Sequence, residues 1–527
     1  MDILRAFNLR RTPQSQPADA RQQPNSAGGY TFVLDDAARL RRFLTLGTDG
    51  ATYYTSAHEL TRQNAECVVR MAETDHATLV RTLVDVSLRG AAPKVNPTLF
   101  ALAIAASIGT DEEKREALAV LPQVVRTGTH LFLFAGYVEQ FRGWGRGLRR
   151  AVASWYADRD VDALAYQAVK YRQREGWSHR DLLRLAHPVA TEDSRRALFD
   201  WIVRGSVGEA TPRLVEGFLK ASEPGADVAA LVGEYGLSWE MLPDAALAEP
   251  GVWEALLAKG MPQTALMRQL PRLTNLGLLP PLGGWTSRVA EQLRDPERLR
   301  KARVHPVNVL IAQRTYASGR GARGSGTWTP TPAVVDALDA AFFAAFGAVE
   351  PSGKRTFLGL DVSGSMTVPI SNLPISAREA SAALALVQLA TEPEAAAFGF
   401  TGGWPATAIN PLSISPRQRL DDVLSYVSGL AFGRTDCALP MLYARDKGLE
   451  VDTFVVYTDN ETWFGDVHPH QALREYREAS GIDAKLVVVG MTATNFSIAD
   501  PDDAGMLDVA GFDQAVPNLI AEFSRGL

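Results

Sequence analysis

The sequence predicts two domains of different fold class, an all-α region of many short helices followed by an α/β domain with a mostly parallel sheet. Strand-like alternation is almost absent before residue 350, whereas apolar runs alternate with helical patterns after Pro351-Ser352-Gly353. A chain of 527 residues is also too long for one ordinary domain. We therefore expect a helical domain over 30–350 and an α/β domain over 351–527, preceded by a lead-in of residues 1–29.

The lead-in and the overall composition exclude several classes of protein. Residues 11–29 are polar and rich in Pro, Gln and Gly, which predicts disorder. The N-terminus lacks the apolar stretch of a signal peptide, and the apolar run from Leu99 to Ile108 is too short to cross a bilayer. The two cysteines, Cys67 and Cys437, form neither a disulfide framework nor a zinc ligand set. These observations predict a cytoplasmic protein without a membrane role.

Helical periodicity dominates the chain from about residue 56 to residue 345. Leu83, Val84 and Leu88 form one apolar stripe, and Asn96-Pro97 begins a helix that continues to Ala106. Many short helices are typical of an α-solenoid, although no sequence period is clean, so the repeat units must be degenerate. Further helices are expected at 112–121, 148–156, 161–173, 179–185, 194–203, 215–221, 228–232, 253–258, 263–270, 287–293, 305–316 and 334–346.

The last third of the chain has the pattern of a parallel sheet covered by helices. Apolar runs predict strands at 356–361, 395–401, 452–458 and 484–490, and helices are expected at 376–390, 416–427, 439–446 and 471–479. Charge also separates the two regions. Residues 1–350 carry 42 Lys and Arg against 38 Asp and Glu, and residues 351–527 carry 12 against 22. An anionic partner would therefore favour the helical region.

Hard oxygen donors follow two of the predicted strands. The strand at 356–361 ends in the pattern D-x-S-x-S, and the strand at 452–458 is followed by another aspartate. Parallel strands expose their carboxyl ends at one sheet edge, and such donors suit Mg²⁺ or Mn²⁺ rather than zinc. With a threonine from a third loop, the set is Asp361, Ser363, Ser365, Thr435 and Asp459.

The spacing of these five residues resembles the metal-ion-dependent adhesion site of a von Willebrand factor A domain. We expect Ser363, Ser365 and Thr435 to bind the ion directly, and the two aspartates to hold it largely through water. This arrangement leaves an open position for an acidic partner or an anion. The alternative interpretation is ordinary Ser/Asp turn chemistry at the ends of the strands.

Basic and aromatic residues are interleaved in two parts of the helical region. Guanidinium groups bind phosphate bidentately and aromatic rings stack on bases, which favours RNA binding. The alternative is a solvated helix face over an aromatic core or, in the second part, a charged Gly-rich linker. The first part includes Arg142, Arg146 and Arg149, and the second includes Lys301, Arg303, Arg320 and Arg323 around a Gly/Arg loop at 319–326.

Several segments resemble the Ro autoantigen family, whose TROVE domain is named for telomerase, Ro and vault proteins. The resemblance covers the chain from about residue 30 to its end and is carried by residues 99–103, 126–132, 176–185, 459–462 and 498–503. It implies a ring of HEAT-like helices closed by a von Willebrand factor A domain. It also implies small noncoding Y RNAs on the outer ring, and single-stranded 3′ ends of misfolded RNA in its hole. The positions implied for Y RNA contact are Lys170, Arg172, Arg174, His179, Arg180, Arg184 and His187.

Three functions of different classes remain. The first is a non-catalytic RNA-binding protein that forms a ribonucleoprotein with Y-like RNA, for RNA quality control or maturation and under stress. The resemblance adds exoribonucleases as partners, and we expect a monomer when no RNA is bound. The second is a metal-dependent adhesion module that recruits an acidic partner. The third, a metal-dependent phosphohydrolase built on Asp361, lacks the second aspartate that such enzymes use, because residue 363 is serine.

Overall fold

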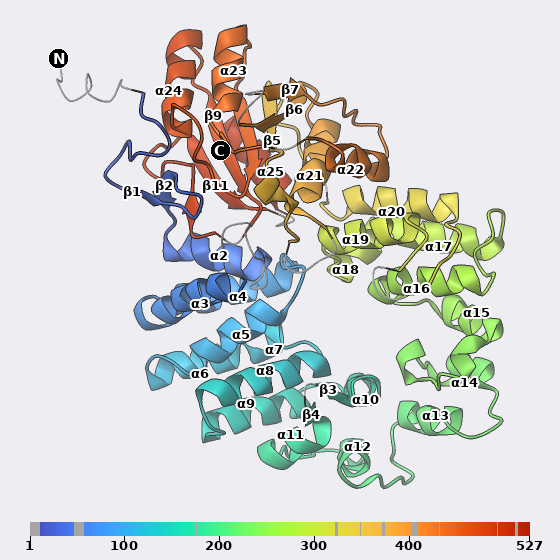
Figure 1. Cartoon of the computed structure of the whole chain (residues 1–527). Coiled ribbons are helices and arrows are strands. Elements are labelled where there is room, and N and C mark those ends of the chain that lie inside the picture. The colour runs from blue at the N-terminus through green and yellow to red at the C-terminus, as the bar shows by residue number, and fades with distance from the viewer. Residues whose placement is uncertain are drawn as a thin grey trace.

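A computed structural model describes residues 11–46, 57–174, 176–321, 325–347, 349–370, 375–402, 408–431, 433–492, 494–511 and 515–526. Both predicted fold classes are confirmed, because helices fill the chain as far as Ala344 and a six-stranded sheet begins at Thr356 (Figure 1). The predicted boundary near residue 350 lies between these two elements. Within the described residues, no helix has both the length and the apolar character needed to cross a membrane.

The helical region runs away from the sheet in one arm and returns to it in another (Figure 1). Short polar caps define individual helices, as where Thr110 and Glu113 form a reciprocal capping box at the start of α6. The first arm contains α2 (Asp36–Leu46), α3 (Ala57–Thr74), α4 (His76–Arg89), α5 (Asn96–Ala105), α6 (Asp111–Ala119), α7 (Leu121–Val124), α8 (Gly128–Phe141), α9 (Arg146–Ala157), α10 (Val161–Lys170), the hairpin β3 (Gln173–Arg174) and β4 (Trp177–Ser178), α11 (His179–Ala186) and α12 (Asp193–Arg204).

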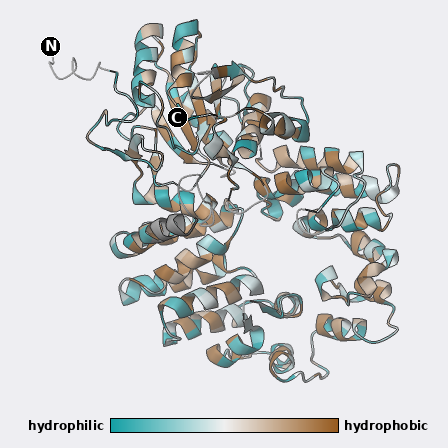
Figure 2. Ribbon diagram, viewed as in Figure 1, coloured by the Kyte–Doolittle hydropathy of each residue, from teal (hydrophilic) through white to brown (hydrophobic). Residues whose placement is uncertain are grey.

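The returning arm continues the same pattern of short helices. Its elements are α13 (Arg213–Ala221), α14 (Val228–Tyr235), η1 (Trp239–Met241), η2 (Ala246–Ala248), α15 (Pro250–Lys259), α16 (Gln263–Asn275), α17 (Gly284–Arg294), α18 (Pro296–Lys301), α19 (Pro306–Ala317) and α20 (Pro332–Ala344). In Figure 2 the helices carry brown and teal residues in alternation along the ribbon. Helices such as α9 and α13 have an apolar face for their neighbours and a polar face for solvent, whereas α5 is buried almost all round.

Both ends of the helical region contact the α/β domain. Arg42 of α2 is 1% exposed in its side chain and lies 2.6 Å from Asp508 of β11. In the returning arm, Arg314 of α19 pairs with Glu379 of α21 at 2.7 Å. The two arms also meet directly, because Nε2 of the buried His305 lies 3.0 Å from the carbonyl oxygen of Ala91.

The sheet has the strand order β11-β9-β8-β5-β6-β7, in which all neighbours are parallel except β6 and β7. The four predicted strands are present, and the edge strands β7 and β11 were not predicted. The strands are β5 (Thr356–Asp361), β6 (Ala395–Thr401), β7 (Ala408–Pro411), β8 (Thr453–Thr458), β9 (Lys485–Gly490) and β11 (Met506–Ala510). The other elements are η3 (Gly364–Thr367), α21 (Ala377–Thr391), α22 (Leu420–Ser428), α23 (Leu439–Lys447), α24 (Pro469–Ser480) and α25 (Val516–Arg525).

The prediction of a disordered lead-in is wrong for residues 11–29. Strand β1 (Gln22–Pro24) pairs with β2 (Tyr30–Val33), which pairs in turn with β10 (Phe496–Ser497). Gln14 is 0% exposed, and its amide donates to Asp436 at 2.7 Å and to the carbonyl of Val467 at 2.8 Å. The segment is ordered because its polar groups find buried partners in the α/β domain, which composition alone does not reveal. Residues 1–10 lie outside the described part of the chain.

Candidate functional site

The sheet brings together the five predicted metal ligands. Strand β5 ends at Asp361 and the neighbouring parallel strand β8 ends one residue before Asp459, so both carboxylates lie at the same sheet edge. Ser363 and Ser365 follow β5, and Thr435 comes from the loop before α23. Every member of the set is at most 3% exposed. The edge is therefore a buried polar cluster between the two central strands.

Hydrogen bonds fix most of the oxygen atoms in this cluster. Asp361 accepts the backbone N–H of Ser363 at 2.9 Å through Oδ1 and the hydroxyl of Thr458 at 2.8 Å through Oδ2. The hydroxyl oxygens of Ser363 and Ser365 lie 3.0 Å apart. Asp459 accepts the backbone N–H of Glu461 at 3.0 Å through Oδ1. Among the described residues its buried Oδ2 has no partner in hydrogen-bond geometry, although the nearby Ser365 hydroxyl lowers the pKa of the carboxyl against the effect of burial. A buried carboxylate oxygen without a partner is costly, and a cation would satisfy it.

The electrostatics of the cluster also fit a cation. Burial raises the pKa of Asp361 above its ordinary value. Burial and the Asp361 carboxylate together raise the pKa of Asp459 to about 7. Two carboxylates and three hydroxyls are hard donors of the kind that Mg²⁺ and Mn²⁺ prefer. Within the described residues, no group of three or more His, Cys, Asp or Glu side chains offers another metal site.

Residues that the sequence did not single out hold this edge in place. Arg378 of α21 is 3% exposed, and its guanidinium donates to the carbonyls of Val362 and Ser363 at 2.6 and 3.0 Å. The lead-in holds the loop after β8, because the Asn25 amide donates to the carbonyl of Thr462 at 2.7 Å. The sequence pattern does not reveal these contacts, because the donors Arg378 and Asn25 both lie outside the D-x-S-x-S turn.

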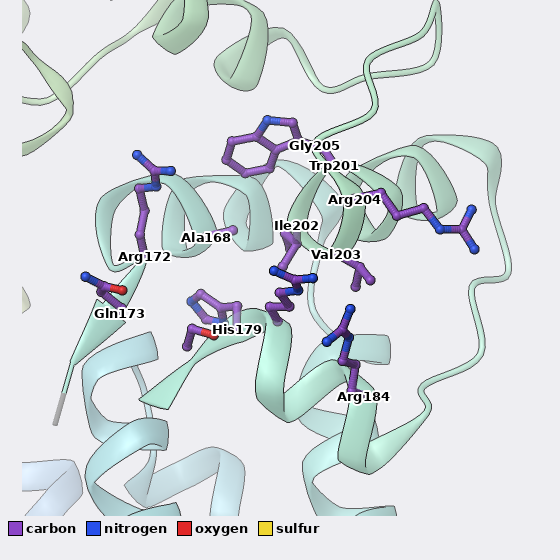
Figure 3. A pocket seen from close by; sticks show the side chains of 12 residues that line it. Ala168, Arg172, Gln173, His179, Arg184, Trp201, Ile202, Val203, Arg204 and Gly205 are labelled. Atoms are coloured by element: carbon purple, nitrogen blue, oxygen red, sulfur yellow. The ribbon is translucent and has the colours of Figure 1, made fainter. Parts of the chain in front are cut away.

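The second candidate site is a cationic cleft in the first helical arm. A cavity of about 830 Å³ lies among the end of α10, the hairpin β3–β4, and helices α11 and α12. Figure 3 shows Arg172 on one side of it, Arg184 and Arg204 on the other, and the indole of Trp201 between them. Arg180 also lines the cavity, and its described lining includes no Asp or Glu. The structure thus brings three of the predicted arginines together and adds Arg204 and Trp201, which the sequence did not single out.

Among the described residues, the predicted arginines of the cleft have no carboxylate partner. Arg172, Arg180 and Arg184 are exposed, and none of them forms an ion pair with a described residue. The nearby carboxylate of Asp181 instead accepts the backbone N–H and the hydroxyl of Ser178, at 3.0 and 2.5 Å, in the capping box that begins α11. A competing hypothesis is that Arg180 and Arg184 pair with Glu175 and Asp181; neither arginine forms an ion pair with Asp181, and Glu175 lies outside the described residues. Unpaired guanidinium groups around a cavity make it a site for an anion.

His179 does not belong to the exposed part of the cleft. It is 2% exposed, its Nδ1 lies 2.7 Å from the hydroxyl of Tyr156, and its ring packs edge-on against Phe132 at a centroid distance of 4.7 Å. Burial lowers the pKa of His179 to about 4. His179 therefore lines the cavity as part of its buried wall, and its role as an RNA contact stays a prediction.

Two further predicted positions, Lys170 and His187, do not line this cavity. The ammonium group of Lys170 is 3.1 Å from Glu240, and its side chain is only 11% exposed. Lys170 lines a neighbouring hollow instead. His187 is exposed and ends α11 in the left-handed conformation, with φ 50°. The side chain of Arg174 lies outside the described part of the structure.

The other predicted RNA contacts are scattered. Arg142 donates to the carbonyl of Ala106 at 2.5 Å and Arg149 to that of Trp144 at 3.1 Å, so both hold the backbone. Arg303 lines a separate cavity of about 440 Å³. Arg323 lies outside the described residues, and three further positions are exposed without lining the cleft: Arg146, Lys301 and Arg320.

Comparison with known proteins gives consistent results over the whole chain. The family model of the TROVE domain matches residues 23–211 and 234–315, and that of the Ro60 vWA domain matches residues 355–524. A Deinococcus radiodurans protein named RNA-binding protein RO60 is 44% identical over 534 residues, covering 100% of this chain and 99% of the relative. A Caenorhabditis elegans protein of the same name is 37% identical over 601 residues, covering 98% and 92%. The crystal structure of the Deinococcus radiodurans RO (RSR) protein superposes with a TM-score of 0.71, covering 93% of this chain and 100% of that one at 44% identity.

Proposed function

The chain belongs to the Ro60 family of TROVE-domain proteins, and from that premise we propose that it binds RNA through the cationic cleft of its first helical arm. The observation that carries the proposal is the cleft itself, where Arg172, Arg180 and Arg184 surround a cavity whose described lining includes no carboxylate. The relatives that resemble the whole chain are named RNA-binding proteins, which supports a binding function without catalysis.

The chemistry of the cleft favours phosphate contacts over the reading of bases. Guanidinium groups bind phosphate oxygens through paired hydrogen bonds, and such contacts position RNA without reporting its sequence. Each contact also releases counterions, so the affinity falls as salt rises. We therefore propose a structured small RNA of the Y type as the ligand, in a ribonucleoprotein that serves RNA quality control or maturation. A role under stress, the capture of misfolded RNA ends, exoribonuclease partners, a monomeric free state and a cytoplasmic location stay predictions.

The sheet edge supports a second proposal, the binding of one Mg²⁺ or Mn²⁺ ion by Asp361, Ser363, Ser365, Thr435 and Asp459. The ion would supply positive charge that balances two buried carboxylates. The unpartnered Oδ2 of Asp459 is the observation that favours it. An adhesion role needs a partner carboxylate to reach the ion, yet each side chain of the set is at most 3% exposed. The burial therefore favours an ion that stabilises the sheet edge over one that recruits a partner.

Fluorescence anisotropy with a labelled small structured RNA tests the RNA proposal. The triple substitution Arg172→Ala, Arg180→Ala and Arg184→Ala should weaken binding by about two orders of magnitude, at roughly 1 kcal/mol per lost contact. The matched control is Arg196→Ala, Arg213→Ala and Arg298→Ala, which removes the same charge from arginines that are paired with carboxylates. Sequencing of RNA that co-purifies with the wild-type protein and with each triple variant would identify the natural ligand.

Two outcomes would contradict the proposal. Equal binding by the wild type and by the cleft variant, at every salt concentration, would remove RNA binding from this cleft. Equal losses in the cleft variant and the control would mean that only net charge matters. The metal proposal is independent, because its residues lie in the α/β domain, and it is tested separately by metal titration.

A further inference from the structure

The cleft contains an aromatic platform as well as cations. Trp201 of α12 is half-buried and lines the cavity. Its ring packs edge-on against Phe218, with centroids 6.3 Å apart and an interplanar angle of 75°. Figure 3 shows the indole directed into the same space as the side chains of Arg172 and Arg184. An indole held from behind by another ring, and open in front, is a surface on which a flat group can stack.

A second hollow continues the cleft beyond Arg172. This cavity, of about 500 Å³, shares Arg172 and Gln173 with the first and is lined by Tyr171 and Phe218, and by Lys170 and Glu240, which pair with each other at 3.1 Å. The guanidinium of Arg172 lies 5.4 Å from the centroid of the Phe218 ring, so it stands where the two hollows meet. The cleft therefore alternates aromatic rings with a cation along its length. That pattern is typical of surfaces that bind unpaired nucleotides.

We infer that the cleft receives an unpaired nucleotide of the bound RNA, with its base stacked on Trp201 and its flanking phosphates held by the arginines. A duplex presents phosphates and 2′-hydroxyls on a convex surface and keeps the faces of its bases stacked inside. A concave cavity with an open indole matches a base that has left the stack. This inference rests on the proposed RNA binding, and adds that the ligand must carry an unpaired base, such as a bulge or a loop.

Arg204 supplies a further phosphate contact in this arrangement. It lines the cavity, and its side chain is 71% exposed. Its guanidinium lies 3.2 Å from Asp200, four residues earlier on α12. Exposed pairs of this kind contribute little, so a phosphate can replace the carboxylate at small cost. Figure 3 shows Arg172 and Arg204 on opposite sides of the Trp201 indole, so the phosphates on either side of a stacked base would each have a guanidinium near them.

Two RNAs that differ by one nucleotide test this inference. The first is a blunt duplex of about 16 base pairs, the length that double-stranded RNA recognition typically spans, and the second is the same duplex with one unpaired 2-aminopurine bulge. The wild type should bind the bulged RNA more tightly. Trp201→Ala should weaken binding of the bulged RNA roughly 5- to 100-fold, as expected for one lost base–aromatic stack, and change binding of the blunt duplex less than about twofold.

Two variants control for the fold. Trp201→Phe keeps an aromatic ring and should retain most of the preference for the bulge. Trp285→Ala removes a half-buried indole, with Arg288 lying 5.0 Å from its centroid, from the opposite arm and should leave both affinities unchanged. The fluorescence of 2-aminopurine reports stacking independently of any variant, and it should be quenched when the wild type binds.

The outcomes separate this inference from the proposed function. Tighter binding of the bulged RNA, with quenching that Trp201→Ala removes, would support the stacked base. Equal wild-type affinity for the two RNAs, or an equal loss for both in Trp201→Ala, would overturn it and leave RNA binding intact. Failure of the wild type to bind either RNA would overturn the proposed function itself.

Discussion

The two candidate sites place charge in opposite ways. The cleft exposes Arg172, Arg180 and Arg184 to solvent without a carboxylate partner, whereas the sheet edge encloses Asp361 and Asp459 at 0% exposure. Exposed cations cost the fold little and act on whatever anion approaches. Buried carboxylates without a counter-charge cost the fold free energy until a proton or a cation joins them. We conclude that the cleft is built for an external ligand and the sheet edge for an ion that belongs to the fold.

The two sites also differ in how the chain assembles them. All the residues that line the first cavity of the cleft lie between Ala168 and Gly205, on neighbouring elements of one arm. The sheet edge instead combines strands β5 and β8 with the lead-in, where the backbone N–H of Ala27 donates to Glu461 at 2.9 Å. A substitution at one site should therefore leave ligand binding at the other site unchanged. The predictions below test that independence.

The largest expected effect concerns the metal. Asp361→Asn should abolish binding of Mn²⁺ in calorimetric titration, because the amide removes a charged ligand. In metal-free buffer at pH 8 the same variant should unfold at a higher temperature than the wild type, because it removes one of two buried, mutually repelling carboxylates. In excess Mg²⁺ the order should reverse. RNA affinity should stay within about twofold of the wild-type value. Only the loss of phosphate contacts would lower it strongly, and Asp361 contributes no such contact.

Asp422→Asn is the matched control, because Asp422 is an exposed aspartate on α22. It should change neither metal binding nor the order of unfolding temperatures. A loss of RNA affinity above about tenfold in Asp361→Asn would show that the sheet edge and the cleft are coupled.

The next effect is a loss of stability in acid. Burial lowers the pKa values of His130, His179 and His470 to about 4 in the folded protein. Because these values lie below the ordinary 6.5, the unfolded chain binds protons first as the pH falls. The stability from neutral histidine is therefore complete above about pH 6.5 and is lost towards pH 4, at up to roughly 3 kcal/mol for each residue.

Urea unfolding at pH 7.5, 6 and 5 measures this loss. His179→Gln should be less stable than the wild type at pH 7.5, since it disturbs the contact with Tyr156, but its stability should fall less steeply with pH. His187→Gln, which changes an exposed histidine, should follow the wild-type curve. If the stability of His179→Gln fell with pH as steeply as that of the wild type, His179 would bind a proton as readily in the folded protein as in the unfolded chain.

A smaller loss of stability is expected from a substitution where the lead-in crosses the loop after β8. A Cβ atom at Gly29 would lie 1.9 Å from the carbonyl oxygen of Thr462, so Gly29→Ala must displace one of the two backbones. We expect a loss of about 1–3 kcal/mol, as for overpacking in a core, and weaker metal binding with unchanged RNA affinity. Gly251→Ala is the control, because a Cβ there meets no atom within 4 Å. Equal stability of the two variants would show that the lead-in detaches without consequence.

The residues that were predicted well share a local signal. Strand β5 could be predicted because the five residues before Asp361, mostly apolar, lead directly to D-x-S-x-S, and Asp459 could be predicted for the same reason at the end of β8. The fold class followed from the change of period near residue 350. In each case the information lies within about ten residues of the site.

The residues that were missed depend on partners far away in the sequence. Gln14 is buried because Asp436, 422 residues later, accepts its amide hydrogen. His179 was assigned to the surface because the sequence does not show that the first residue of α11 faces Tyr156. The helix that carries Trp201 could be predicted from its apolar positions. The cavity beside this helix could not be predicted. Periodicity gives the face of a helix, and only packing gives its neighbour.

The smallest expected effect is also the most specific to the cleft. Arg180→Ala removes one exposed guanidinium that has no carboxylate partner, so it should cost one phosphate contact and little stability. The slope of log affinity against log salt should therefore become shallower by about 0.7 to 0.9, the range for single-stranded to double-stranded nucleic acid. Arg196→Ala makes the same change of charge, but its guanidinium lies 2.6 Å from Asp193 and outside the cavity, so its slope should match that of the wild type. A slope that changes equally in both variants would mean that RNA senses the overall charge of the arm, and the contrast between the cleft and the rest of the surface would be lost.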